Sequence, residues 1–471
     1  MTFTISNKTQ LSDLINIREY VEELIIEREI LIDDLQLEFF EDLKKLKFGD
    51  HYFADINPTK RVKIQHLEFG FHYNLPIDFS QFTELRYLKF GENYDQPINT
   101  ISLVKLQHLE FGECYVQQTD LSLLVELKYL KFGNQYFQRI ICSSLSKLQH
   151  LEFGDEYNVE TDFSQFVELK YLKFGSYYNQ PTDLSTLSNL QHLEFGTDYN
   201  QLTNLSMLVK LKYLKFSNFY NKETNLSSLV ELTHLEFDNF YNRTTNLTML
   251  VKLTYLEFKQ NYNKITDLST LVNLTHLKFG QGYNKITDLS TLVNLKHLEF
   301  GIKYNQLTNL SALVNLTHLI FGCNYNQTTD LSTLVNLQHL TFSWDYNQIT
   351  DLSMLVNLTH LKFGFHYNQQ TDFSTLVNLT YLKFGGKYNQ LTNLKKCINL
   401  QHLEFDYHYN QPIDLSTLVN LTHLKFGNDY NQPTNLSNCI NLILLKFNTF
   451  SIKQINFSKY EKIGDIWQEK N

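Results

Sequence analysis

LVNLTHLKFGQGYNKITDLST, residues 271–291, is one copy of a unit that recurs along most of the chain. Counting from Phe279 in steps of twenty-one positions meets a Phe at every stop from Phe48 to Phe447, and 447 − 48 = 399 = 19 × 21. The unit therefore occurs twenty times without an insertion or a deletion. A self-similar period of about twenty to fifty residues marks a solenoid, whose units must stack because none of them can bury its apolar face alone.

Each unit contains a short strand that ends at this Phe, which we call the zero column. Leu stands two residues earlier in every copy, as at Leu277, and the residue between the two varies. This alternation is the period-2 signature of a strand with one buried face. Strands that return unchanged in every copy must pair in parallel and in register, at a spacing of about 4.8 Å.

The residues before the strand predict a tight turn. Leu268, Leu271 and Leu274 are spaced by three residues, which favours a short helical or 3₁₀ segment. Asp267 and Ser269 have side-chain oxygens that can accept the free N–H groups at its start. After the zero column, Gly, Tyr and Asn recur, and we expect the Asn column to hydrogen-bond turn backbone within and between coils.

The fold class predicted from these patterns is α/β, a right-handed solenoid with one parallel sheet of about 20 short strands. Each coil would hold one copy of the unit and have a short helical or 3₁₀ turn on its other side. Because this back is thin, we expect the stack to be a flat rod with little curvature.

The register of the repeat predicts three segments in one elongated domain. Residues 1–42 include the helix-favouring run REYVEELIIERE and predict an N-terminal helical cap, with a helix through about Glu23. Residues 43–447 form the solenoid of twenty repeats. Residues 448–471 predict a C-terminal degenerate half repeat that covers the last coil, because an array needs caps over its apolar ends.

Composition and charge exclude several classes. A hydrophobic fraction of 42% with 19% charged residues is typical of a folded protein, and a net charge of −9 gives no electrostatic reason to expect nucleic acid. The residues after Met1 show no signal peptide, and no apolar run approaches the roughly eighteen residues of a membrane span. Asn-x-Ser/Thr sequons are frequent and would attract dense glycosylation in a secretory pathway, so we expect an intracellular, cytoplasmic protein without membrane contact.

Two halves of the unit resemble known repeats. KITDLSTLVNLTHLKF, residues 264–279, resembles the helical side of internalin-like leucine-rich repeats. FGENYDQPI, residues 90–98, resembles the FNIP repeat, as does YNQPI at residues 409–413, with Tyr-Asn in place of the Phe-Asn of the name. FNIP repeats occur in amoebal and giant-virus proteins and are regarded as leucine-rich-repeat relatives that bind other proteins. The resemblance, which runs from residue 43 to residue 447, implies a leucine-rich-repeat-like solenoid, an amoebal or viral source and a protein partner.

The copies differ most in the two columns that lie two and three residues after the zero column. Aromatic residues exposed on a rigid surface are typical anchors for a protein partner, although rings in one column can also pack sideways on one another. The predicted partner-binding residues are Trp344, Phe365 and Tyr407 in the plus-two column, Asp345, His366, Lys387 and His408 in the plus-three column, and a second patch of Phe219 and Phe240.

Two columns of the strand itself carry charge. The minus-one column alternates Glu and Lys from Glu68 to Glu236, which predicts a ladder of exposed ion pairs that fixes the register of the coils. The minus-three column alternates His and Tyr and then holds five consecutive histidines, which are His276, His297, His318, His339 and His360. Imidazoles on one straight face do not converge as a tetrahedral site requires, so no metal is predicted. Below about pH 6 these imidazoles should become charged and repel one another.

The most favoured function is a non-enzymatic protein–protein interaction scaffold that binds one partner on its sheet face as a monomer. The alternative is a passive structural or surface-binding array for glycan, ice or a particle, which would present the Asn column and the Thr column of Thr266, Thr287, Thr308, Thr329 and Thr350 as a lattice. An enzyme is the weakest candidate, because no nucleophile elbow, phosphate-binding Gly loop, HExxH or CxxC pair occurs. We therefore predict no catalytic residue and no cofactor.

Overall fold

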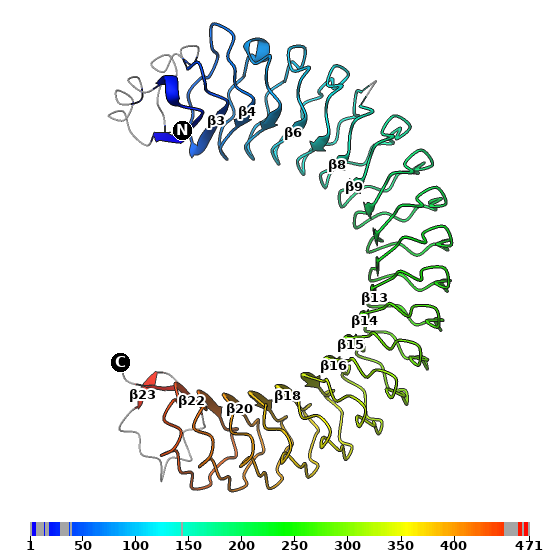
Figure 1. The fold of residues 1–471 in the computed structure, drawn as a ribbon, viewed down its shortest axis with the longest axis vertical. Helices are drawn as coiled ribbons and strands as arrows, with labels where there is room; N and C mark the ends of the chain where they lie inside the picture. Colours follow the sequence, from blue (N-terminus) through cyan, green and yellow to red (C-terminus); the bar gives the residue numbers. More distant parts are fainter. Residues whose placement is uncertain are drawn as a thin grey trace. The chain divides into compact units, whose positions relative to one another are not determined.

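The computed structural model describes residues 2–5, 14, 18–28, 37, 40–142, 145–446, 460–463 and 466–469. It divides into two compact units, residues 1–232 and residues 233–471, and each unit is a stack of similar coils (Figure 1). The boundary after Leu232 falls inside one copy of the uninterrupted repeat, residues 229–249.

The first unit is a parallel sheet of short strands. Its repeat strands are β3 (Lys45–His51), β4 (His66–Glu68), β5 (Tyr87–Lys89), β6 (His108–Glu110), β7 (Tyr129–Lys131), β8 (His150–Glu152), β9 (Tyr171–Lys173), β10 (His192–Glu194) and β11 (Tyr213–Lys215). Neighbours pair in parallel at an offset of one repeat, as in His66↔Tyr87. The register predicted from the sequence is confirmed.

The amino-terminal region contains strands where a helix was predicted. β1 (Thr2–Ile5) pairs in parallel with β2 (Glu23–Arg28), which in turn pairs with β3, and the 3₁₀ helix η1 covers only Arg18–Tyr20. Leu14 is helical and Arg18–Tyr20 form a 3₁₀ turn, but from Glu23 to Arg28 the chain is a strand and not part of a helix. Leu24 and Ile26 alternate with more exposed residues and are buried against the next coil, so sheet pairing overrides the helical preference of this run.

The second unit continues the same pattern. Its strands are β12 (His234–Phe237), β13 (Tyr255–Phe258), β14 (His276–Lys278), β15 (His297–Glu299), β16 (His318–Ile320), β17 (His339–Thr341), β18 (His360–Lys362), β19 (Tyr381–Lys383), β20 (His402–Glu404), β21 (His423–Lys425), β22 (Leu444–Lys446), β23 (Tyr460–Ile463) and β24 (Ile466–Glu469). The strands pair in parallel as far as the β21–β22 pair. Beyond it, β24 pairs antiparallel with both β22 and β23. Of the predicted half repeat, residues 448–459, 464–465 and 470–471 lie outside the described residues.

The backs of the coils are tight turns and contain almost no helix. In the coil before β14, the Leu271 N–H donates to the Leu268 carbonyl at 3.0 Å, and the Ser269 N–H donates to Asp267 Oδ1 at 2.9 Å. A similar Asp78 cap precedes the 3₁₀ helix η3 (Phe79–Gln81). The chain is thus a parallel β-solenoid of about twenty turns with 3₁₀-type bends, and the predicted fold class is confirmed.

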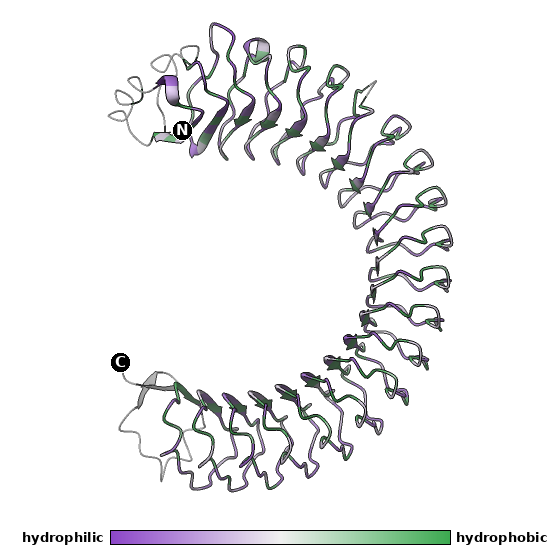
Figure 2. Cartoon of the chain, in the orientation of Figure 1, coloured by the Kyte–Doolittle hydropathy of each residue, from purple (hydrophilic) through white to green (hydrophobic). Residues whose placement is uncertain are grey.

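Identical side chains stack in the core of each unit. Leu298 and Tyr304 have no exposed surface, and Phe300 exposes 2% of its surface. Hydrophobic and hydrophilic residues recur at the same places in successive coils of a unit (Figure 2). Each coil therefore buries its apolar residues against the neighbouring coils.

The buried Tyr column explains the Thr column. The Tyr304 hydroxyl lies 2.5 Å from Thr308 Oγ1, which also donates to the Gln306 carbonyl at 2.9 Å. Thr308 exposes only 6% of its surface, and Thr266, Thr287 and Thr350 are buried in the same way. The prediction that this column presents a surface lattice is therefore wrong, because its hydroxyls satisfy buried Tyr hydroxyls.

The Asn column links each coil to the next, as predicted. The backbone N–H of Asn347 donates to Asn326 Oδ1 at 3.0 Å, and that of Asn368 donates to Asn347 Oδ1 at 2.9 Å. Gln348 Nε2 adds a bond to Asn326 Oδ1 at 3.1 Å. These contacts make a continuous ladder beside the Tyr column.

Within each unit the coils are spaced more widely at the back than at the strands. Ring centroids are 4.2 Å apart for His318 and His339 on the outward face of the strand, and 6.2 Å apart for Tyr325 and Tyr346 behind it. Each unit consequently curves with its strands on the inner side (Figure 1). The expected flat rod is wrong, because the stacked rings of the Tyr column keep the backs of the coils apart.

Candidate functional site

Carboxylates of the minus-one column contact side chains of their own strand and of a neighbouring strand. Glu110 lies 2.7 Å from His108 Nε2 and 3.3 Å from Lys89 Nζ. These partners lower the pKa of Glu110, and the hydrogen bond with His108 has the largest effect. Together they outweigh burial, which acts in the opposite direction. The predicted Glu–Lys ladder is present in part, as in the Lys89–Glu110 pair, and its acids also bind the minus-three histidines.

Among the consecutive histidines of the second unit, His297 lies 3.8 Å from Glu299, but His318, His339 and His360 lack this arrangement. His318 and His339 stack at 4.2 Å, and His339 and His360 at 4.3 Å. Their strands carry Ile320, Thr341 and Lys362 in the minus-one column, where His108 has Glu110. Burial, and then the neighbouring His318 and His360, lower the pKa of His339 to about 4. Burial is also the main cause that lowers the pKa of His318 and of His360.

The second unit should therefore lose stability as the pH falls from about 6.5 towards 4. In this range the unfolded chain binds protons that folded His339 does not, so acid favours unfolding. We expect His339 to account for about 1 kcal/mol of the loss between about pH 7.5 and about pH 5.5. Urea unfolding of the wild type and of His339→Gln at both pH values measures this contribution of His339 to the loss of stability. His192→Gln, which removes a histidine that hydrogen-bonds Glu194 at 2.6 Å, is the control. An identical pH dependence of the wild type and His339→Gln would contradict the assignment.

Three aromatic residues of the plus-two column form what we call the ring patch, made of Trp344, Phe365 and Tyr407. Trp344 and Phe365 stack with centroids 4.6 Å apart and planes 6° from parallel, and Tyr407 meets Phe365 edge-on at 6.3 Å. The coil between Phe365 and Tyr407 has Gly386, where a Cβ would lie 2.2 Å from Phe365 Cε2. The glycine therefore allows the Phe365 ring to lie directly over the backbone.

The ring patch lies in the turn after the strand, and not on the strand as predicted. β17 ends at Thr341, and Trp344 follows in the turn. The rings do pack sideways on one another, yet Trp344 still exposes 54% and Tyr407 50% of their surfaces. The sideways packing is thus present, and the rings remain accessible.

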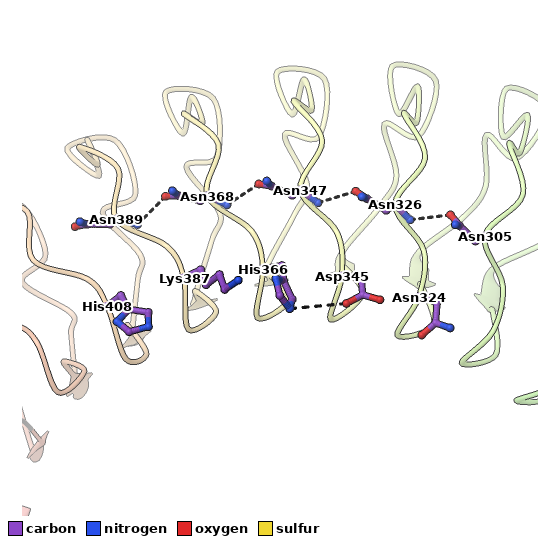
Figure 3. Close-up of a pocket in the computed structure, with 10 residues that line it drawn as sticks. All are labelled: Asn305, Asn324, Asn326, Asp345, Asn347, His366, Asn368, Lys387, Asn389 and His408. Carbon is purple, nitrogen blue, oxygen red and sulfur yellow. Dashed lines mark hydrogen bonds and ion pairs between the residues drawn. The ribbon is translucent and has the colours of Figure 1, made fainter.

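The plus-three residues form one wall of an open groove of about 810 Å³ beside the ring patch (Figure 3). Asp345 Oδ1 lies 3.9 Å from His366 Nε2, and His408 Nδ1 lies 2.7 Å from Asp429 Oδ2. Lys387 is exposed, and no carboxylate of the described residues lies within ion-pair distance of it. The opposite wall is the Asn ladder. We call this the amide groove, lined by Asn305, Asn324, Asn326, Asp345, Asn347, His366, Asn368, Lys387, Asn389 and His408.

The predicted second patch is not a single described site. Phe219 exposes 43% of its surface in the first unit, and Phe240 exposes 45% in the second. Each ring is accessible, so each stays a candidate anchor by itself.

Sequence reasoning missed an apolar hollow in the second unit. A groove of about 380 Å³ lies over Gly301 and Gly322 and is lined by Ile302, Ile320 and Cys323, among others. Ile302 exposes 40% of its surface. The signal was present in the sequence, because Ile320 interrupts a minus-one column that is charged in the preceding coils.

The described residues hold neither a cluster of metal-binding side chains nor a membrane-spanning helix. His, Cys, Asp and Glu side chains within them do not gather in groups of three or more that could hold a metal ion. No helix in this part of the chain is both long enough and apolar enough to cross a membrane.

Comparisons with known proteins place this fold. No protein-family model and no curated protein sequence matches the chain. Among solved structures, it is similar to CroV588, described as a novel circular leucine-rich-repeat protein, with 28% identity, a TM-score of 0.60 and coverage of 97% of this chain and 79% of that one. It is also similar to YopM from Yersinia enterocolitica WA-314, with 13% identity, a TM-score of 0.50 and coverage of 93% and 94%. The structural neighbours are thus leucine-rich-repeat proteins, and this chain has a leucine-rich-repeat-like solenoid fold.

Proposed function

We propose that the chain is a non-enzymatic protein-interaction scaffold whose partner docks on the ring patch. The observation that carries the proposal is the Trp344–Phe365 stack, in which Trp344 exposes 54% of its surface while it is held against a half-buried Phe365 of the next coil. An anchor that is already ordered loses little conformational entropy on binding. Large aromatic side chains of this kind contribute most of the binding energy at protein interfaces.

The surroundings of the ring patch also suit an interface. Asp345, His366 and Lys387 place charges of both signs beside the rings, which resembles the polar rim around an apolar centre. The leucine-rich-repeat-like fold supports a role as an interaction scaffold. The alternative of a regular surface lattice loses part of its basis, because most of the Thr column is buried, whereas Asn326 and Asn347 of the Asn column are exposed.

Affinity capture tests the ring patch. We expect the intact chain to retain a partner that the Trp344→Ala/Phe365→Ala/Tyr407→Ala variant loses, because the variant lacks all three rings. The matched control is Phe137→Ala/Tyr177→Ala, which removes two rings that each expose 51% of their surface in the first unit. Urea unfolding confirms that both variants are folded. Equal partner sets from the intact chain and the triple variant would discard the ring patch as the anchor.

Two finer assignments follow from the sequence. The FGENYDQPI motif at residues 90–98 supports repeats of the FNIP type, and with them an amoebal or viral source. A cytoplasmic location is supported by the sequon asparagines, since Asn315 Nδ2 donates to the Val293 carbonyl at 2.9 Å and Asn357 Nδ2 to the Val335 carbonyl at 2.9 Å. Glycosylation of these nitrogens would remove bonds between coils. Mass spectrometry of the protein from its source, showing bare sequons, is the expected result.

A further inference from the structure

The amide groove runs along the array, across several coils of the second unit (Figure 3). One wall displays a single residue from each coil, with Asp345, His366 and Lys387 in succession. The other wall displays one Asn from each coil, including Asn347 and Asn368. A ligand that lies in this groove therefore meets the same geometry again at each coil.

The Asn wall offers hydrogen-bond donors. Asn347 Oδ1 accepts the backbone N–H of Asn368 at 2.9 Å and Gln369 Nε2 at 3.2 Å, and Asn326 Oδ1 is occupied in the same way. A backbone N–H can only donate, so the amide oxygen must face it and the orientation of each amide is fixed. The Nδ2 groups remain as donors that line the groove. They suit a ligand with regularly spaced carbonyl oxygens.

The spacing of the coils matches an extended peptide. The buried Tyr column lies between the two walls. The distances between the ring centroids of successive coils are 6.2 Å for Tyr325 and Tyr346, 6.2 Å for Tyr346 and Tyr367, and 6.1 Å for Tyr367 and Tyr388. In an extended strand, side chains on one face repeat every two residues, at about 6.6 Å or somewhat less when the strand is twisted. A strand along the groove would thus place two residues on each coil and one carbonyl group towards each Nδ2 donor.

A helix also has a repeat close to this spacing, since four residues rise about 6 Å, but it does not suit the groove. Its carbonyl groups are occupied by its own hydrogen bonds, except at the last turn. The row of Nδ2 donors would then have no acceptors to bind. The donor wall therefore favours the extended form.

We propose that the amide groove binds an extended peptide segment along the array, with two residues per coil. A basic residue of this segment faces Asp345, and an acidic residue four positions away faces Lys387, which lies two coils further on. The inference rests on the proposed function, because it assigns the partner class of the same region, and it names the form and the charge pattern of that partner.

Fluorescence anisotropy with synthetic peptides of about ten residues tests the register. The peptides are otherwise made of Thr and Ser and contain Lys-x-x-x-Glu, Lys-x-x-Glu, or Lys and Glu separated by seven residues as a two-turn helix would need. We expect the full chain to bind the Lys-x-x-x-Glu peptide roughly fivefold more tightly than either other peptide, since each exposed ion pair contributes little by itself. Equal binding of all three, or preference for the helical spacing, would overturn the extended register.

Charge reversal tests the two positions separately. Lys387→Glu should favour a Lys-x-x-x-Lys peptide, and Asp345→Lys should favour Glu-x-x-x-Glu, each in either chain direction. Lys303→Glu is the matched control, because Lys303 is an exposed member of the same column outside the amide groove and should leave the preference unchanged. Variants that keep the wild-type preference would overturn the assigned contacts.

The two proposals can fail separately. If the ring-patch variant loses the captured partner but the chain binds all three peptides equally, the proposed function stands and this inference is overturned. If the chain prefers the Lys-x-x-x-Glu peptide but removal of the rings leaves capture unaffected, the amide groove is supported and the ring patch is discarded as the anchor.

Discussion

Replacing Gly301 by Ala is expected to lower the free energy of unfolding of the second unit by about 3 kcal/mol or more. A Cβ there would lie 1.7 Å from the Gly280 carbonyl oxygen and 2.3 Å from its carbonyl carbon. Both are backbone atoms of the preceding coil, so relief of the clash must separate two coils that pair through the sheet. Urea unfolding followed by circular dichroism measures the loss.

Ser343→Ala is the matched control for Gly301→Ala. Ser343 occupies the same column and already has a Cβ, and its hydroxyl donates to the Tyr325 carbonyl. The substitution removes one buried hydrogen bond and introduces no new atom into the contact between coils. We expect a loss of about 1 kcal/mol. If both substitutions destabilised the unit equally, the close approach of the glycine backbones would not limit the stacking of the coils.

Tyr304→Ala is expected to destabilise the second unit by about 3–5 kcal/mol. The side chain is fully buried, and its ring lies 4.1 Å from that of Phe300 and 6.0 Å from that of Tyr283. Both neighbouring coils are fixed in register by the Asn ladder, so they cannot collapse onto the cavity. The same urea unfolding measurement gives the value.

Tyr304→Phe separates the ring from its hydroxyl. The ring stack remains, but Thr308 Oγ1 loses the hydroxyl that lies 2.5 Å away and keeps its bond to the Gln306 carbonyl. A loss of about 1 kcal/mol is expected. A loss as large as that of Tyr304→Ala would show that the hydroxyl pair, and not the packing of the ring, dominates this position.

The solenoid was predictable because the same pattern recurs in twenty copies, so that chance variation in any one copy does not hide it. A single Leu-x-Phe alternation, as at Leu277 and Phe279, indicates a strand only weakly, whereas its strict return in every copy leaves stacking in register as the consistent solution. The amino-terminal run lacks this support. Read by propensity, ELIIER favours a helix, but the alternate burial of Leu24 and Ile26 shows that pairing with the first repeat strand decides its conformation.

The candidate site was predictable in part. The exposed rings of Trp344 and Tyr407 were found because they interrupt a regular column. The donor wall was not, because the orientation of the Asn amides depends on bonds between coils that no local pattern shows. The burial of the Thr column was missed although it had a signal, since Tyr304 and Thr308 are four residues apart and this pairing recurs through the array.

The Asn ladder also bears on how such a gene can change. Each bond joins residues 21 or 22 positions apart, as from Asn347 to Asn326 and from Gln348 to Asn326. Duplication or deletion of one whole copy by unequal recombination restores the same bonds at the new junction, whereas any partial copy breaks them on both sides. The number of copies can therefore change by whole units without loss of these bonds.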